Sequence, residues 1–437
     1  MRALACLLCA LGAAATAQDL LIRNATVYPV SGPRIDNASV LVLGGKISEI
    51  GAKVTLPKNA KGFKIVDGKG LSVYPGMIDS ATQIGISEIG SVRETNDSGE
   101  VGDFNPQLRA LVAVNPESEH IPVVRANGIT SAIVVPANIG GGGGGGFGAA
   151  AGGFIGGQVS LIHLNGWTWE EMEINRGAGM HLRFPVVSAG AFNPETFSVS
   201  RGNYTVARQN KDNQVRQIKN FFEQARRYKT AKDAGSPDWK SDTHLEAMIP
   251  VLEGKMPLMV LASREREIRE AIEWADQERV KIILANVRKP GKALDLIVKK
   301  SIPVIVSPTL AAPQDEDDPY DEPYTNPATL AKAGVQIAFG SFGNEFSRNL
   351  PYQAAMAVNF GLPYEEGLKA ITLNPARIWG VADKYGSIEP GKMADLILTD
   401  GDLLEARTQV KMMFIHGVAV DLESKHTRLY KKYLARP

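Results

Sequence analysis

Hydrophobic and polar residues follow one pattern at the two ends of the chain and another in the middle. Near the N-terminus, residues 19–30 and 38–51 alternate apolar and polar positions, and Gly44-Gly45 interrupts the second run. Residues 385–400 and 408–420 have a similar pattern near the C-terminus. A period of two with a glycine pair is typical of antiparallel strands joined by a tight turn. We therefore expect two β-rich ends that pair into one small domain.

The middle of the chain has a different pattern. Short runs rich in β-branched residues occupy residues 128–136, 184–190, 256–263, 280–286, 302–308 and 335–341. Between several of them, apolar residues recur at spacings of three and four, as in residues 214–231, 264–279 and 291–300. Asn326 is expected to cap a further helix. This alternation predicts an α/β fold, with a (β/α)8 barrel as first choice and a doubly wound sheet as second.

These patterns predict the organisation of the whole chain. We expect a signal peptide at residues 1–17, a (β/α)8 TIM-type barrel at residues 75–380, and a small β-sandwich domain built from both chain ends, residues 18–74 and 381–437.

The first residues have the form of an export signal. Arg2 precedes a short apolar run, and Ala15-Thr16-Ala17 has the small-x-small form of a cleavage site. The run is shorter than the about 20 residues that span a bilayer, so we expect no membrane span in the mature chain. The prediction is a periplasmic or secreted protein cleaved near Ala17. Cys6 and Cys9 both lie in the segment removed, which leaves no thiol for a disulfide, a zinc–cysteine site or a nucleophile.

Composition excludes one class of partner. The net charge is +1, the mean hydropathy is −0.10, and 44% of the residues are hydrophobic. This is an ordinary globular balance, so no nucleic-acid partner is expected.

Three motifs, in order along the chain, carry a family resemblance: "PGMID" at residues 75–79, "NPAR" at 374–377 and "GSIEPGKMADL" at 386–396. Together they resemble the metal-dependent amidohydrolase superfamily, particularly its imidazolonepropionase-like and secreted peptidase-like branches. The resemblance implies a barrel that binds a divalent metal such as zinc and hydrolyses carbon–nitrogen bonds. It also implies a His-x-His pair after the first barrel strand, histidines after strands five and six, and an aspartate from strand eight.

This sequence departs from that pattern at each expected ligand position. The positions that match the lost metal ligands are Ala81, Gln83, Leu261, Asn286 (or the adjacent Ala285) and Phe342. None of them has an imidazole, carboxylate or thiolate. We therefore predict that the metal site is degenerate, that ligands for a metal cofactor are absent, and that no catalytic residue can be assigned.

Other polar groups offer weaker candidates. The chain has six histidines, none in a His-x-His pattern: His120, His163, His181, His244, His416 and His426. His163 follows a strand-like run and could face the pocket, but we favour a histidine hydrogen-bonded in a loop beside Trp167 and Trp169. We place His416 and His426 away from the barrel mouth. The acids of residues 315–322 are interpreted as a solvated loop. The glycine run at residues 140–146 is interpreted as a flexible surface or lid loop, because no phosphate-binding lysine follows it.

Two functions remain open. The first is an exported, non-catalytic amidohydrolase-like protein that binds a small ligand, forms a homo-oligomer, or is the silent partner of an active paralogue. The alternative is a hydrolase of carbon–nitrogen bonds, acting on a cyclic amide or dipeptide-like substrate, with an atypical centre. A weaker idea is that Trp167 and Trp169 belong to a docking surface on the barrel rim.

Overall fold

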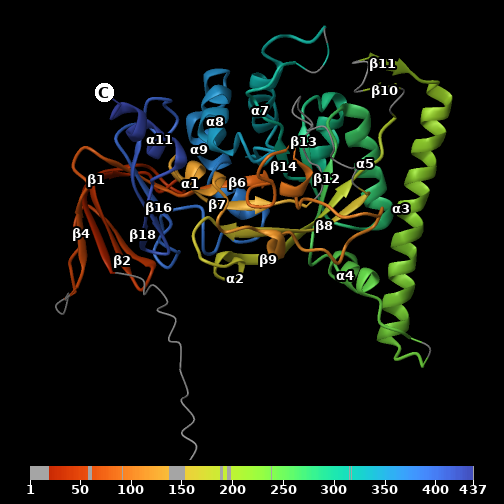
Figure 1. The fold of residues 1–437 in the computed structure, drawn as a ribbon, viewed down its shortest axis with the longest axis horizontal. Helices are drawn as coiled ribbons and strands as arrows, with labels where there is room; N and C mark the ends of the chain where they lie inside the picture. The colour runs from red at the N-terminus through yellow and green to blue at the C-terminus, as the bar shows by residue number, and fades with distance from the viewer. Residues whose placement is uncertain are drawn as a thin grey trace, which may run out of the picture.

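The computed structural model describes residues 19–57, 62–90, 92–136, 153–187, 190–193, 198–237, 239–313, 315 and 317–436. The expected signal peptide and the glycine run at residues 140–146 lie outside these residues. The middle of the chain forms an eight-stranded, nearly closed sheet surrounded by helices (Figure 1).

The strands of this barrel-like sheet lie in chain order. They are β6 (Met77–Thr82), β7 (Ile129–Val134), β8 (Ile155–His163), β9 (Glu173–Arg183), β12 (Leu258–Leu261), β13 (Ile282–Val287), β14 (Val304–Val306) and β15 (Ile337–Phe339). The last strand returns to the first, where the Phe342 amide donates to the Ala81 carbonyl over 2.8 Å. The prediction of an α/β fold with a barrel is confirmed at this level.

The arrangement differs from a regular (β/α)8 barrel at the third strand. β8 runs antiparallel to both neighbours, whereas the other adjacent pairs are parallel. The physical reason is its connection to β9, which contains only the four-residue helix α2 (Trp169–Met172). Such a link is too short for the crossover that a parallel pair requires. β8 therefore ends at the barrel face where its neighbours begin.

Helices cover the outside of the barrel. They are α1 (His120–Arg125), α3 (Tyr204–Asp233), α4 (Thr243–Leu252), α5 (Glu265–Glu278), α6 (Leu294–Lys299), α7 (Glu322–Lys332), α8 (Leu350–Asn359), α9 (Tyr364–Ala370) and α10 (Leu373–Ile378). The predicted period is confirmed in α3, which buries Ile218, Phe221, Phe222 and Ala225. A separate hairpin consists of β10 (Gly190–Asn193) and β11 (Ser198–Arg201).

Two local predictions are wrong. The strand expected at residues 184–190 does not form at 184–187, because β9 ends at Arg183 and Pro185 has no amide to donate. Helix α7 begins at Glu322, one turn before the expected cap. Asn326 lies inside that helix, and its amide donates instead to the Val287 carbonyl of β13 over 2.9 Å.

The two chain ends pair into a second sheet, seen at the left of Figure 1. It contains β1 (Leu20–Val27), β2 (Ile35–Leu43), β3 (Lys46–Gly51), β4 (Lys64–Asp67), β5 (Ser72–Pro75), β16 (Leu396–Thr399), β17 (Val410–Ile415) and β18 (Val418–Val420). The ends meet where β16 pairs antiparallel with β5. Gly44 and Gly45, at φ 54° and 78°, make the predicted tight turn. The two-layer sandwich and the exact domain boundaries stay predictions.

Candidate functional site

The residues predicted at the metal-ligand positions lie at the carboxyl ends of the barrel strands. Ala81 lies in β6, Leu261 ends β12, Asn286 lies in β13, and Phe342 follows β15. Ala81 and Phe342 are buried members of the apolar cluster that fills the barrel, and the partly buried Leu261 packs against them. Gln83, just beyond β6, is partly exposed. The strand ends are thus occupied by a methyl group, an aromatic ring and an aliphatic side chain.

Close contact between the first and last strands leaves little space at this mouth. A Cβ atom added to Gly340 would lie 3.0 Å from the Ala81 Cβ. The Thr82 hydroxyl lies 2.6 Å from the Gly343 carbonyl, and Ser347 joins the hydroxyls of Thr82 and Ser341 at 2.9 Å each. These bonds link the ends of β6 and β15.

The backbone at the mouth is strained at two of the five positions. Asn286 and Phe342 have φ values of 62° and 53°, in the left-handed region that non-glycine residues seldom adopt. Such a conformation costs on the order of 1–3 kcal/mol and is concentrated at functional sites. The strand ends therefore have the backbone irregularity of a site, although apolar side chains occupy it.

One acid remains buried beside the mouth. The Oδ1 atom of Asp79 accepts from the amides of Ala81 and Ser341 over 3.2 and 3.0 Å, while Oδ2 has no hydrogen-bond partner among the described residues. Burial raises the pKa of this carboxyl from 3.8 to about 7. With an apolar group at three of the five positions and amides at the other two, the mouth does not fit the imidazole-rich metal centre that the resemblance implies.

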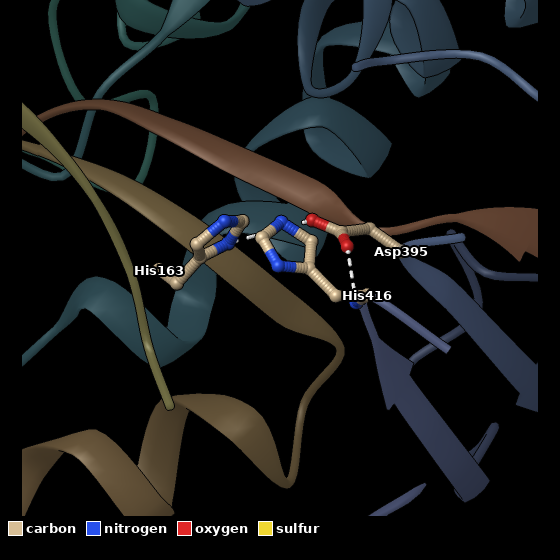
Figure 2. Close-up of side chains that lie close together, drawn as sticks. All are labelled: His163, Asp395 and His416. Atoms are coloured by element: carbon tan, nitrogen blue, oxygen red, sulfur yellow. Dashed lines mark hydrogen bonds and ion pairs between the residues drawn. The ribbon is translucent and has the colours of Figure 1, made fainter. Parts of the chain in front are cut away.

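A different set of potential ligands converges at the opposite end of the barrel. His163 ends β8, Asp395 immediately precedes β16, and His416 lies in the turn between β17 and β18. Figure 2 shows that the three side chains point toward one another. One ligand atom from each lies within 4.8 Å of the other two, so that they could hold a metal ion. The prediction that the chain lacks metal ligands is therefore wrong.

The three side chains are linked by short contacts. The His163 Nδ1 lies 3.6 Å from the Asp395 Oδ2, and the Asp395 Oδ1 accepts from the His416 backbone amide over 2.8 Å. The two imidazole rings have centroids 3.9 Å apart and are nearly perpendicular. The Tyr385 hydroxyl lies 3.4 Å from the His163 Nε2 and 3.1 Å from the His416 Nε2.

Burial controls the charges of this cluster. His163 and Asp395 are buried, and His416 is partly exposed. Burial raises the pKa of Asp395 from 3.8 to about 7. Burial, and then His416, lowers the pKa of His163 well below 6.5, and burial also lowers that of His416. The imidazoles are therefore neutral, the form in which they bind metals.

Sequence reasoning missed this cluster because its members come from segments far apart in the chain. His163 was interpreted as a loop residue, but it ends a strand whose reversed direction was not predicted. Trp167 is 83% exposed, and Trp169 packs partly against the core, so neither holds His163 in a loop. The available signal was the predicted pairing of the chain ends, which brings residues 395 and 416 beside the barrel.

The acidic segment at residues 315–322 and the histidine His181 were also considered as site residues. The described acids of residues 315–322 include Asp315, which pairs with Arg264 and Lys289 over 2.7 and 2.8 Å, so it is an ion-paired surface group. His181, which the sequence could not place, lies fully buried in β9. Its neighbours Met180 and Leu182 face the helices, so His181 faces the barrel interior beside Met259. Both of its ring nitrogens lack partners among the described residues, and burial lowers its pKa to about 4.

A cavity of about 480 Å³ lies away from both sites. It is lined by the loop after β1 and by α9, with Tyr28, Arg34, Tyr364 and Asp402 in its wall. It is open enough for a small molecule, but no residue of the barrel mouth or of the histidine cluster lines it.

The comparisons with known proteins agree with the fold. The Amidohydrolase family pattern matches residues 321–420. An amidohydrolase from Thermotoga maritima superposes with a TM-score of 0.77 and 28% identity, covering 92% of this chain and 99% of that one. A prolidase solved with N-methylphosphonate-L-proline has a TM-score of 0.55 at 16% identity, which shows the shared fold alone.

Two curated relatives are similar to the chain over different spans. Amidohydrolase tasK of Hapsidospora irregularis is 22% identical over 460 residues, covering 95% of this chain but 45% of that protein. Imidazolonepropionase of Porphyromonas gingivalis is 39% identical over 79 residues, 17% of this chain and 19% of that one. The chain thus spans less than half the length of these relatives.

The fold and these similarities define a protein with an amidohydrolase-like barrel. Residues 321–420 match the Amidohydrolase family, and the chain as a whole is similar to proteins named amidohydrolase. Within the described residues, no helix has the length and apolar character needed to cross a membrane.

Proposed function

We propose that this chain is a member of the amidohydrolase family that does not catalyse hydrolysis at its barrel mouth. The observation that supports this proposal is the packing of Ala81, Leu261 and Phe342 into one apolar cluster at the strand ends. Metal-assisted hydrolysis requires an ion with an open coordination position and a bound water. An apolar cluster offers neither ligands for the ion nor hydrogen bonds for the water.

A substrate panel tests this proposal. The purified chain is incubated with dipeptides and cyclic imides, with zinc or manganese added in one series and a chelator in another. We expect no turnover in either series. Turnover that requires added metal and is lost in Gln83→Ala would contradict the proposal, because it would place a working ion at the mouth.

We further propose that the chain is the silent partner of a catalytically competent amidohydrolase. Helix α11 (Lys425–Leu434) supports this proposal, because all its residues are exposed. Its large apolar residues, Leu429, Tyr430, Tyr433 and Leu434, are between 44% and 70% exposed and fall on one side of the helix. The chain also matches less than half of tasK. In that protein the matching part is therefore joined to further sequence, which fits a fold that functions together with a second domain or subunit.

The partner proposal is tested by assembly mass and by identity. The chain is recovered from its native host under mild conditions, and its companions are identified by mass spectrometry. We expect a family member that retains the His-x-His pair, and we expect Tyr433→Glu with Leu434→Glu to release it. A purified monomer with no such companion, in both wild type and variant, would refute the proposal; a homodimer broken by the variant would replace it with self-association.

We also propose that the protein is exported. The support is the form of residues 1–17, with a charged start, an apolar run and a small-x-small end. N-terminal sequencing of protein recovered from the native host should begin at Gln18. Recovery of a chain that starts at Met1 would contradict export by this route.

A hydrolase with an atypical centre remains the second candidate. The favouring observation is the pair of buried, unpartnered groups in and beside the barrel interior, the Oδ2 atom of Asp79 and the ring of His181. Buried polar atoms without partners are uncommon and often mark a functional role. Chelator-resistant turnover in the panel above, lost in Asp79→Asn and in His181→Leu, would favour this candidate over the silent subunit.

A further inference from the structure

We propose that His163, Asp395 and His416 hold a divalent transition-metal ion that joins the sheet of the chain ends to the amino-terminal face of the barrel. The site is distinct from the barrel mouth. It is also independent of the proposed function, because the ion would stabilise the fold and take no part in catalysis.

The position of the cluster indicates a structural ion. β8 is antiparallel to β7 and β9, and its last residue, His163, pairs beside Ser131 near the start of β7. That end is the amino-terminal face of the barrel, whereas enzymes of this architecture use the carboxyl face. Asp395 and His416 come from the sheet of the chain ends, so an ion bound by all three would bridge two parts of the fold.

The donor set selects the type of ion. Two imidazoles and one carboxylate suit zinc, copper or nickel, whereas calcium and magnesium prefer oxygen ligands alone. Ligand atoms about 2.0–2.2 Å from a tetrahedral zinc ion lie about 3.4 Å from one another. The 3.6 Å between the His163 Nδ1 and the Asp395 Oδ2 is close to that separation.

Two of the proposed ligand atoms make no hydrogen bond to the described residues. The Asp395 Oδ2 and the His163 Nδ1 are both buried and without hydrogen-bond partners among the described residues. Leaving such groups unpaired is unfavourable, and a cation between them would satisfy both. The Tyr385 hydroxyl lies beside the other ring nitrogen of His163, Nε2, and beside the Nε2 of His416, so it would help to orient the two rings for an ion.

The backbone around two of the ligands is already organised. His416 and Gly417 have φ values of 51° and 74°, which make a two-residue turn between the paired residues Ile415 and Val418. The hydrogen bond from the His416 amide to the Asp395 Oδ1 fixes this turn to the start of β16. The geometry therefore leaves the Asp395 Oδ2 directed at His163, so that little rearrangement is needed for an ion to bind.

A cobalt titration of the full mature chain tests the proposal without reference to activity. Metal-stripped wild-type protein is titrated with Co²⁺ and then with Zn²⁺, followed by visible absorption and by metal content. We expect one Co²⁺ per chain with the strong absorption of a four-coordinate site, displaced by one Zn²⁺. A wild-type protein that shows neither absorption nor stoichiometric zinc overturns the proposal.

Matched variants locate the ion. His416→Asn removes the imidazole but keeps a residue that tolerates the left-handed turn. Asp395→Asn keeps the acceptor for the His416 amide. Loss of a residue that only hydrogen-bonds to a metal ligand weakens metal binding about 10- to 100-fold. Loss of a ligand itself should therefore weaken Co²⁺ binding by more than about 100-fold in each variant. His244→Asn, an exposed histidine on α4, is the control and should bind as wild type.

The pattern among variants separates this site from the barrel mouth. Binding lost in His416→Asn and Asp395→Asn but kept in Gln83→Ala supports the junction site. Binding kept in the first two and lost in Gln83→Ala overturns it. If one variant does not fold, the other and the wild-type spectrum still decide between these outcomes.

Discussion

At the scale of single residues, Ala81 and Gly340 are closely packed where the first and last barrel strands meet. Both residues are small, and the two strands approach until an added Cβ on Gly340 would lie 3.0 Å from the Ala81 Cβ. Restoring an imidazole there should therefore overpack the core rather than recreate a ligand. Overpacking typically costs about 1–3 kcal/mol.

Ala81→His should thus lower the free energy of unfolding by about 1–3 kcal/mol, measured by urea denaturation. Ala435→His, at an exposed position after α11, is the control and should change the stability by less than about 0.5 kcal/mol. A variant as stable as wild type would show that the mouth has room for a ligand, contrary to the packing described above.

The buried Asp79 carboxyl should make the stability depend on pH. Its pKa is about 7 in the folded protein against 3.8 for an exposed carboxyl. Because the folded state holds the proton more tightly, this group stabilises the fold below about pH 4, and that contribution is lost as the pH rises through 7. Asp79→Asn stays neutral and keeps an acceptor for the two amides.

The measurement compares wild type with Asp79→Asn by urea denaturation at about pH 4.5 and about pH 7.5. Wild type should lose more stability than the variant between these conditions, by about 1.4 kcal/mol for each unit of pKa shift that is realised. Asp395 titrates in the same direction, but it is present in both proteins and cancels in the comparison. Equal losses would show that Asp79 is not held neutral by burial.

The position of Ala81 at the end of a barrel strand could be predicted from sequence, whereas the histidine cluster could not. Ala81 follows a motif that ends in Asp79, so that its place at a strand end needed no tertiary information. His163 gave no such signal, because its orientation depends on the reversal of β8. Asp395 and His416 meet it only after the chain ends have paired, which is a consequence of the whole fold.

At the scale of elements, β9 was not among the strands predicted from the sequence. It contains Gly177 and Gly179, which in sequence are typical of a loop. The structure explains both glycines by close approach: a Cβ on Gly179 would lie 2.8 Å from the Trp379 ring, and one on Gly177 would lie 3.1 Å from the Met256 methyl. By contrast, α3 and α5 depend on local apolar periodicity and were predicted within their main spans.

Gly179→Ala should therefore destabilise the protein by about 1–3 kcal/mol, because Trp379 is buried and can move only by disturbing the interior of the barrel. Thermal unfolding gives the comparison. Gly90→Ala is the matched control, since its added Cβ meets nothing within 4 Å, and it should be near neutral. If the two substitutions have equal effects, the contact between β9 and Trp379 is not a constraint on the strand.

At the scale of the whole molecule, the fold depends on the meeting of two chain ends. β16 lies between β5 and β17, so that the N-terminal strands complete their sheet only with residues from the end of the chain. The apolar cluster of this sheet includes Ile22 and Val73 from one end and Leu396 and Phe414 from the other. Helix α11, which follows, contributes no buried residue to it.

Two truncations should consequently behave differently. Deletion of residues 396–437 removes three strands, exposes one edge of β5 and part of its apolar cluster, and should abolish cooperative unfolding or yield aggregated protein. Deletion of residues 425–437 alone should leave the unfolding midpoint nearly unchanged, because the ion pair between Arg428 and Glu119 that it removes is exposed, and such pairs contribute about 0–1 kcal/mol. The shorter deletion also separates folding from assembly: it should release the proposed partner while the chain remains folded. Calorimetry and light scattering on both truncated proteins measure these outcomes, and a stable, monodisperse chain ending at residue 395 would contradict the dependence of the fold on its C-terminal strands.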